Sequence, residues 1–328
     1  MDRANAAAAL HTDAIVCDLI LPWGEYGRKE LREQTLSRFA ENGVDFVSLT
    51  LATDTQPQAE VFRAIARERR YLLAQPDRFR LIESVDDILA SKTDGTLAVS
   101  FNLQGTNAFA GNLDMVETFY KLGVRQALMA YNYKNLVGDG CHERTDSGLS
   151  RFGVQLVEEM NRVGMIVDCS HTGYRTSMEV MEVSTKPVVF SHSNPRSLWH
   201  HDRNIRDEQA KACAETGGMI GVVGLGIFMG DGDASTDALL RQIDHYAELL
   251  GVEYVGLGLD YVYDVEAMQE IMTRVAPASG NYSKMTSFFQ PEQLPELTEA
   301  MIAKGYSDRA VRGVLGENFL RVAAEVWR

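Results

Sequence analysis

The sequence predicts an α/β protein, a single (β/α)8 barrel over residues 1–328 with a C-terminal helical tail. Short runs rich in β-branched residues alternate with amphipathic helical patterns from one end of the chain to the other. Runs such as "PVVF" and "MIVD" are continuously apolar, which is typical of strands buried on both faces. Eight β/α units in about 260 residues match the size of one barrel. A doubly wound open sheet is less favoured, because no glycine-rich phosphate loop follows the first strand.

The expected strands follow one another along the chain without a dividing linker. In order they are 14–20, 44–51, 96–103, 124–132, 165–171, 187–193, 218–226 and 252–260. Helical patterns fill the intervals, for example at 29–43, 149–164 and 235–251. For the second of these helices, Ser150 is the expected N-cap and Gly164 the expected end. For the third, Ser235 or Thr236 is the expected cap and Gly251 the expected end.

Composition narrows the classes of partner. The formal net charge of −14 makes a nucleic-acid or anionic-membrane partner improbable. The four cysteines are scattered and form no CxxC pair, so neither a disulfide framework nor a zinc knuckle is indicated. The first residues lack the apolar stretch of a signal peptide, and no run of about 18 apolar residues occurs. The expected location is the cytoplasm.

Polar side chains gather at the expected C-terminal ends of the strands, where barrels of this kind carry their reactive groups. Those positions are Gln104, Tyr131, Asn132, His171, His192 and Asp260. The two histidines end successive apolar strands in the same Ser-His context, "DCSH" and "FSHS". Neutral imidazoles suit a divalent metal ion, most commonly zinc, and a nearby carboxylate can hold or deprotonate the attacking water. The sequence therefore predicts a metal site over the barrel mouth.

A second candidate metal-ligand pair, His11 and Asp13, lies at the wrong end of its strand. It precedes the apolar run of 14–20, so it falls at the bottom of the barrel. We expect a structural role there, with Thr12 or Asp13 ending a preceding helix. The remaining histidines, at positions 142, 200, 201 and 245, lie in polar contexts, and together with His11 they mostly suggest surface residues.

Several longer motifs resemble the membrane (renal) dipeptidase family of zinc peptidases. They include "DCSHTG", "PVVFSHSNPRSL", "HDRNIRDE", "VGLGLD" and "GVLGENFLRV", in order along nearly the whole chain. The resemblance implies a barrel of the metal-dependent hydrolase type that cleaves dipeptides, often as a homodimer. It implies that His171 and His192 bind one metal ion and that Asp260 is the acid/base group. Arg203 would bind the substrate carboxylate, with Tyr131 and Asn132 beside the substrate.

The family binds two zinc ions bridged by a glutamate, and this chain departs from that pattern at the subsite that His171 and His192 do not form. The family's His-x-Asp of strand one falls on Ile20 and Pro22, and its bridging glutamate falls on Gln104, a weak ligand at best. We therefore expect one zinc ion per chain, as in a divergent branch of the family. Two substitutes for the lost ligands remain open. One is the loop segment Cys141–His142–Glu143, and the other is Asp18 at the expected top of strand one.

The expected function is metal-dependent hydrolysis of a dipeptide or similar small amide that bears a carboxylate. Two alternatives remain, because a fold does not fix a chemistry. One is a non-peptidase amidohydrolase acting on another small amine or amide. The other is a binding protein that keeps the pocket and Arg203 but has lost turnover. The retained His171, His192 and Asp260 favour an active enzyme, whereas the loss of one metal subsite favours a binding protein without catalytic activity.

Overall fold

The eight expected strands form one parallel sheet that curls into a barrel. The computed structural model describes residues 3–24, 27–275, 282 and 287–328. The strand order is β1 (Cys17–Pro22), β2 (Phe46–Thr53), β4 (Leu97–Gln104), β5 (Val124–Leu128), β6 (Ile166–Asp168), β7 (Val188–Phe190), β8 (Met219–Val222) and β9 (Val255–Leu257). A further short strand, β3 (Phe79–Leu81), pairs with β4 outside this path and was not predicted. The predicted barrel is confirmed.

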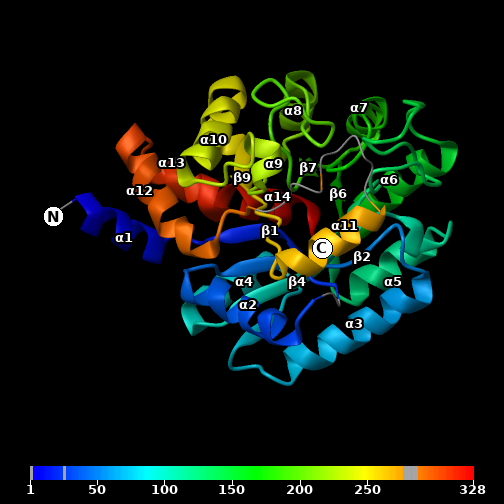
Figure 1. Ribbon diagram of the computed structural model, residues 1–328. Helices are drawn as coiled ribbons and strands as arrows, with labels where there is room; N and C mark the ends of the chain where they lie inside the picture. Colours follow the sequence, from blue (N-terminus) through cyan, green and yellow to red (C-terminus); the bar gives the residue numbers. More distant parts are fainter. Residues whose placement is uncertain (1–2, 25–26, 276–281, 283–286) are drawn as a thin grey trace.

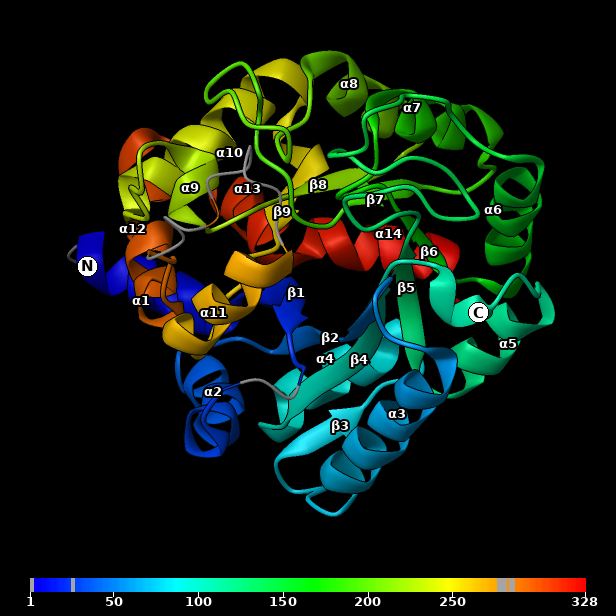
Figure 2. The same cartoon turned by 45° about the vertical axis from the view of Figure 1, so that its right-hand side comes forward.

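Helices surround the ring of strands (Figures 1 and 2). They are α1 (Arg3–Asp13), α2 (Lys29–Glu41), α3 (Gln58–Leu73), α4 (Val85–Asp94), α5 (Asp114–Lys121), α6 (Arg151–Val163), α7 (Tyr174–Val183), α8 (Asp207–Glu215), α9 (Gly226–Met229), α10 (Thr236–Leu250), α11 (Val265–Val275), α12 (Leu294–Lys304), α13 (Asp308–Arg312) and α14 (Asn318–Val326). Within residues 3–24, 27–275, 282 and 287–328, no helix is long and apolar enough to cross a membrane.

The predicted helix boundaries hold where capping residues set them. The Ser150 hydroxyl accepts a hydrogen bond from the Gly153 amide at the start of α6, and α6 ends at Gly164 with φ +94°. At the start of α10 the cap is Ser235, whose hydroxyl accepts from the Ala238 amide. Each cap satisfies an amide that the first helical turn leaves without a partner. Of the two residues left open for α10, Ser235 is therefore the cap.

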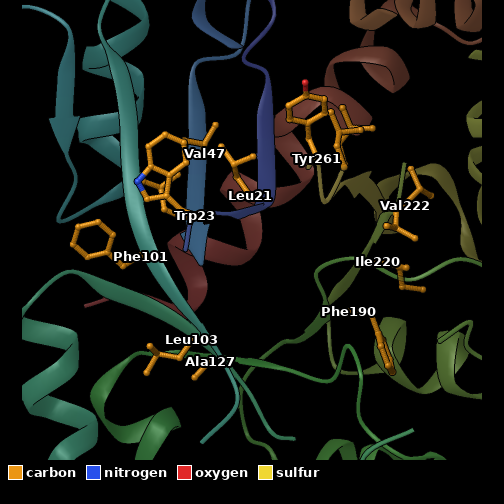
Figure 3. Packing of buried hydrophobic residues seen from close by; sticks show 14 of the residues in the cluster. Leu21, Trp23, Val47, Phe101, Leu103, Ala127, Phe190, Ile220, Val222 and Tyr261 are labelled. Atoms are coloured by element: carbon orange, nitrogen blue, oxygen red, sulfur yellow. The ribbon is translucent and has the colours of Figure 1, made fainter. Parts of the chain in front are cut away.

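The core has two parts. The larger lies between the ring of strands and the helices; Figure 3 shows Val47 of β2, Phe101 of β4 and Phe190 of β7 among its side chains. The smaller lies at the N-terminal ends of the strands, where Phe319 of α14 stacks on Phe46 with ring centroids 5.2 Å apart. Helix α14 thus closes the bottom of the barrel, and the top is left for chemistry.

The His11–Asp13 segment lies at the bottom, as predicted. Asp13 is the last residue of α1. His11 is buried, and its two ring nitrogens lie 2.8 Å from the Thr298 hydroxyl and 3.2 Å from the Asn42 carbonyl oxygen. Its role is structural, but the expectation that it is a surface residue was wrong. The same correction applies to His142, whose side chain is 1% exposed, and to His201, which is buried.

Candidate active site

The two predicted histidines lie side by side at the top of the barrel. His171 follows β6 and His192 follows β7, and both are buried. Their Nε2 atoms are 3.0 Å apart, and their ring centroids are 5.0 Å apart. The parallel pairing of β6 with β7 brings them together, because successive parallel strands end at the same edge of a barrel. The Ser-His repeat in the sequence therefore marks one site.

The outer nitrogen of each ring has its own partner. His171 Nδ1 lies 2.7 Å from Asn132 Oδ1, and His192 Nδ1 lies 2.7 Å from the Ser191 hydroxyl. The Cys141 thiol also donates to Asn132 Oδ1, at 3.7 Å, so two groups converge on that amide oxygen. Partners of this kind fix the orientation of metal-binding imidazoles and keep the Nε2 lone pairs directed at the metal.

The electrostatics keep both rings neutral. Burial, followed by the positive charge of Arg203, lowers the pKa of His171 and of His192 well below the ordinary value. Neutral imidazole is the form that ligates a metal ion. Both imidazoles can therefore bind a cation at neutral pH without a change in their net charge.

Asp260 and Tyr131 complete the predicted polar group. Burial raises the pKa of Asp260 to about 6, and the charge of Arg203 opposes that rise. A carboxyl group with such a pKa can exchange a proton near neutral pH. The Tyr131 ring lies 4.4 Å from the His171 ring, centroid to centroid. Burial, with a contribution from Asp260, raises the pKa of Tyr131 to about 12, so Tyr131 acts as a neutral hydrogen-bonding group.

Arg203 is buried next to His192 and is not a surface residue. It is 2% exposed, its Nη2 donates to the His192 carbonyl oxygen at 3.4 Å, and its guanidinium lies 5.4 Å from the centre of the Phe228 ring. Its Nε has no hydrogen-bond partner among the described residues. Because a buried charged donor without a partner is costly, this guanidinium is suited to receive an anionic ligand group.

A polar cavity of about 200 Å³ adjoins Arg203. His171, Cys141 and Arg203 form part of its wall, together with Asn204 and Tyr174, the first residue of α7. The cavity therefore joins one of the two imidazoles to the carboxylate-binding candidate, whereas His192 and Asp260 are not part of its wall.

The remaining candidates occupy other positions. Gln104 is buried, and its amide nitrogen contacts the Thr50 hydroxyl at 3.3 Å. Burial raises the pKa of Cys141 to about 11, which disfavours the thiolate that a metal ion would need. Asp18 was expected at the top of strand one, but it is the second residue of β1 and bonds the Leu259 amide. The Glu143 carboxylate accepts from the Lys134 and Arg144 amides.

The two imidazoles are spaced to share a metal ion, but they have few further donors around them. Two imidazoles on one tetrahedral zinc ion have nitrogens about 3.3 Å apart, close to the 3.0 Å observed here. Among the described residues, however, no group of three His, Cys, Asp or Glu side chains could hold a metal ion. Ile20 is apolar and wholly buried in β1, and Pro22 ends that strand. The two imidazoles are spaced to share one metal ion, but the described residues bring no third donor of these types to it and none to a second ion.

Sequence reasoning missed three residues that organise this site. Asp54 follows β2 and accepts from the Tyr131 amide at 3.0 Å, from the Asn107 amide at 2.9 Å and from the Asn135 side chain at 2.9 Å. Ser191 and Asp168 support His192 from within the barrel. The repeated Ser-His motif in the sequence could have identified Ser191. The sequence around Asp54 contains no motif that could have identified Asp54.

The chain matches the membrane dipeptidase family, peptidase family M19, over residues 14–328. It belongs to that family. An uncharacterized dipeptidase of Schizosaccharomyces pombe is 31% identical over 220 residues, 65% of this chain and 51% of the other. Dipeptidase verJ of Clonostachys rogersoniana is 27% identical over 252 residues, 76% of this chain and 61% of the other. This M19 chain thus spans about half to three fifths of the length of these curated relatives.

Solved structures extend the likeness to the whole fold of this M19 chain. An amidohydrolase from Pseudomonas aeruginosa is 34% identical, with a TM-score of 0.88, covering 98% of this chain and 99% of that one. A metallopeptidase from Rhodobacter sphaeroides, bound to a phosphinate mimic of the dipeptide L-Ala-D-Ala, is 21% identical with a TM-score of 0.79. That comparison covers 96% of this chain and 100% of the other, and it supports the barrel fold.

Proposed function

We propose that this chain is a metal-dependent hydrolase that cleaves a dipeptide or a similar small amide bearing a free carboxylate. The observation that carries the proposal is the facing pair of His171 and His192, with the buried Arg203 bonded to the His192 carbonyl oxygen and interacting electrostatically with Asp260. Membership of the dipeptidase family supports it, as do the relatives named dipeptidases. The dipeptide mimic bound to the Rhodobacter sphaeroides relative supports the substrate class by analogy.

His171 and His192 would hold one zinc ion per chain. Such an ion lowers the pKa of a bound water and polarises a carbonyl oxygen. Asp260, with its pKa near 6, takes the proton of the attacking water and can return it to the leaving amine. Asn132 and Ser191 hold the two imidazoles in place, and Tyr131 lies against the His171 ring where the substrate would pass.

Arg203 would anchor the substrate carboxylate in the cavity. A bidentate contact between a guanidinium and a carboxylate in a partly dry site contributes about 1.5–3 kcal/mol, or roughly ten- to a hundred-fold in binding. Lysine keeps the charge but loses the planar pair of donors, so the two changes Arg203→Lys and Arg203→Ala should weaken such a substrate almost equally.

The test compares kcat/KM for a dipeptide and for its C-terminal amide on the wild type, Arg203→Lys and Arg203→Ala. We expect the wild type to prefer the free carboxylate by roughly ten-fold or more, and both variants to lose that preference. Equal treatment of the two substrates by the wild type would contradict the assignment of Arg203. Absence of turnover on any dipeptide, with zinc supplied, would contradict the hydrolase itself.

Metal content provides an independent test. We expect about one equivalent of zinc per chain, and His171→Ala or His192→Ala should each abolish it, because a site with two strong donors cannot lose one. Anomalous scattering that showed a tightly held metal pair beside Ile20 would contradict the one-zinc proposal.

A second candidate function is hydrolysis of a non-peptide amide on the same site. The 34% identity to the amidohydrolase from Pseudomonas aeruginosa favours it. Turnover of N-acyl amino acids in preference to dipeptides would distinguish it. A cytoplasmic location and a homodimer remain predictions from the sequence.

A further inference from the structure

Ser191 lies between a buried carboxylate and one of the two facing imidazoles. It is fully buried at the end of β7, and its hydroxyl oxygen is 2.7 Å from His192 Nδ1. Its amide donates to Asp168 Oδ1 at 3.1 Å. Its hydroxyl oxygen also lies 3.3 Å from the Ser170 hydroxyl oxygen.

Asp168 is the last residue of β6 and is wholly buried. Its Oδ1 also accepts from the Ser170 amide at 2.8 Å, and its Oδ2 accepts from the Gln126 side chain at 2.7 Å. Burial raises the pKa of Asp168, and hydrogen bonds led by the Ser191 side chain oppose that rise. The Ser191 hydroxyl therefore has three groups that can accept its proton: the His192 imidazole, the Ser170 hydroxyl at 3.3 Å, and the Asp168 carboxylate, whose pKa its side-chain hydrogen bond lowers.

The hydrogen bonds around His171 determine which nitrogen of His192 carries its proton. His171 Nδ1 faces an amide oxygen, which only accepts, so His171 is protonated on Nδ1 and its Nε2 accepts. The Nε2 atom of His192, 3.0 Å away, must then be the donor. Its Nδ1 is left as an acceptor, and the Ser191 hydroxyl donates to it.

Metal binding requires the opposite arrangement on His192. Two imidazoles that share a zinc ion both present Nε2 lone pairs, so His192 loses its Nε2 proton to solvent and gains one from solvent on Nδ1, and its net charge stays zero. The Ser191 hydroxyl then accepts from Nδ1–H and needs an acceptor of its own. That acceptor is the Asp168 carboxylate, bonded directly or through the Ser170 hydroxyl.

We propose that the Ser191 hydroxyl is a two-way link that donates to His192 Nδ1 while the imidazoles bond each other and turns to Asp168 when both imidazoles bind a metal ion. Ser191 and Asp168 are then positioning residues for the metal site. This inference rests on the proposed function, because it assumes that His171 and His192 share a metal ion.

The test measures zinc affinity of the full-length chain by competition with a chromophoric chelator. Loss of an outer hydrogen-bond partner of a metal-bound histidine typically costs 10–100-fold in affinity, and we expect that loss for Ser191→Ala. The matched control is Ser193→Ala, which removes a fully buried hydroxyl two residues away that has no partner among the described residues. It should leave the affinity within about two-fold of wild type. An unchanged affinity in Ser191→Ala would overturn the proposal.

A second readout does not depend on activity or on zinc affinity. Nitrogen-15 NMR of labelled histidines reports which ring nitrogen carries the proton. Before zinc is added we expect His192 to be protonated on Nε2, and with zinc on Nδ1. Protonation on Nδ1 before zinc is added would overturn the link. Protonation on Nε2 in a wild-type protein that binds no zinc would support the link before metal binding while contradicting the proposed function, so the two failures are distinguishable.

Discussion

Three residues of the candidate site have a backbone conformation that side chains rarely adopt. Asn132, His171 and Asp260 have φ of +62°, +62° and +54°, and only one other described non-glycine residue, Ala110, has a positive φ. Each such residue costs of order 1–3 kcal/mol and persists only where the surroundings impose it. Each of the three follows the end of a barrel strand by three or four residues, in the loop at the top of the barrel. The strain is thus concentrated where function is proposed.

This geometry limited the sequence prediction at the level of residues. Alternation and apolarity correctly located His171 and His192, but they predicted strands through 171 and 260 where β6 and β9 end at Asp168 and Leu257. A residue other than glycine that adopts a positive φ cannot be recognised from the sequence pattern around it. Arg203 was named only through the family resemblance, because its burial next to His192 is a tertiary property.

The pH dependence of activity should report the ionisation of Asp260. Burial raises its pKa to about 6 in the metal-free fold, and a bound zinc ion would lower that value, so kcat/KM should rise with pH up to about 6 and then level off. Because the charge of Arg203 lowers this pKa, Arg203→Gln should move the rise to higher pH, whereas Arg203→Lys should leave it in place. The measurement is a kcat/KM profile for all three proteins, each saturated with zinc. An acid limb that does not move in Arg203→Gln would contradict the pairing.

At the scale of elements, the strands and capped helices were predictable and the loops were not. Ser150, Gly164 and Ser235 act locally, so their letters suffice. Strand β3, with the sequence FRL, is too short to show a periodicity. The loops after β4 and β5 are held by Asp54, which is far from both in the sequence. Gly105, in the loop after β4, has φ +139° and no room for a Cβ beside the Asp54 carboxylate.

Removing the Asp54 carboxylate should loosen the loops that carry Tyr131. Asp54→Ala leaves the amides of Tyr131 and Asn107 without their acceptor, which should cost about 1–3 kcal/mol in the free energy of unfolding. It should also lower kcat/KM, because the Tyr131 ring lies against His171. Denaturant unfolding and steady-state kinetics measure the two effects. The control is the exposed Asp77→Ala; a stability loss in Asp54→Ala with unchanged kcat/KM would show that Asp54 does not position the site.

At the scale of the molecule, the bottom of the barrel is closed by a helix, and the first and last strands, β1 and β9, are joined by a polar contact that we call the seam. Helix α14 covers the N-terminal ends of the strands with apolar side chains. The seam between β1 and β9 is bridged by Asp18, whose Oδ1 accepts from the Leu259 amide at 2.8 Å. Its Oδ2 is buried and has no partner among the described residues. A charge here is poorly solvated, so ionisation of the Asp18 carboxyl group should destabilise the fold.

This dependence predicts how stability varies with pH. Burial raises the pKa of Asp18 to about 8 in the fold, above its ordinary value of 3.8. The folded chain therefore holds a proton that the unfolded chain releases, and the stabilisation is complete below about pH 4 and is lost as the pH rises through about 8. Asp18→Asn keeps an oxygen for the Leu259 amide and cannot ionise, so its stability should fall less over that range.

The measurement is the free energy of unfolding in denaturant at about pH 5 and about pH 9. The free energy of unfolding of Asp18→Asn, minus that of the wild type, should be larger at the second pH than at the first. At the second pH the folded wild type must either bury the Asp18 charge or keep the carboxyl group protonated, and the variant does neither. Asp13→Asn removes an exposed carboxylate at the end of α1 and serves as the control for the loss of one negative charge. If wild type and Asp18→Asn lose stability in parallel, the seam carboxyl is not the group that titrates, and the stability of the fold does not depend on its ionisation.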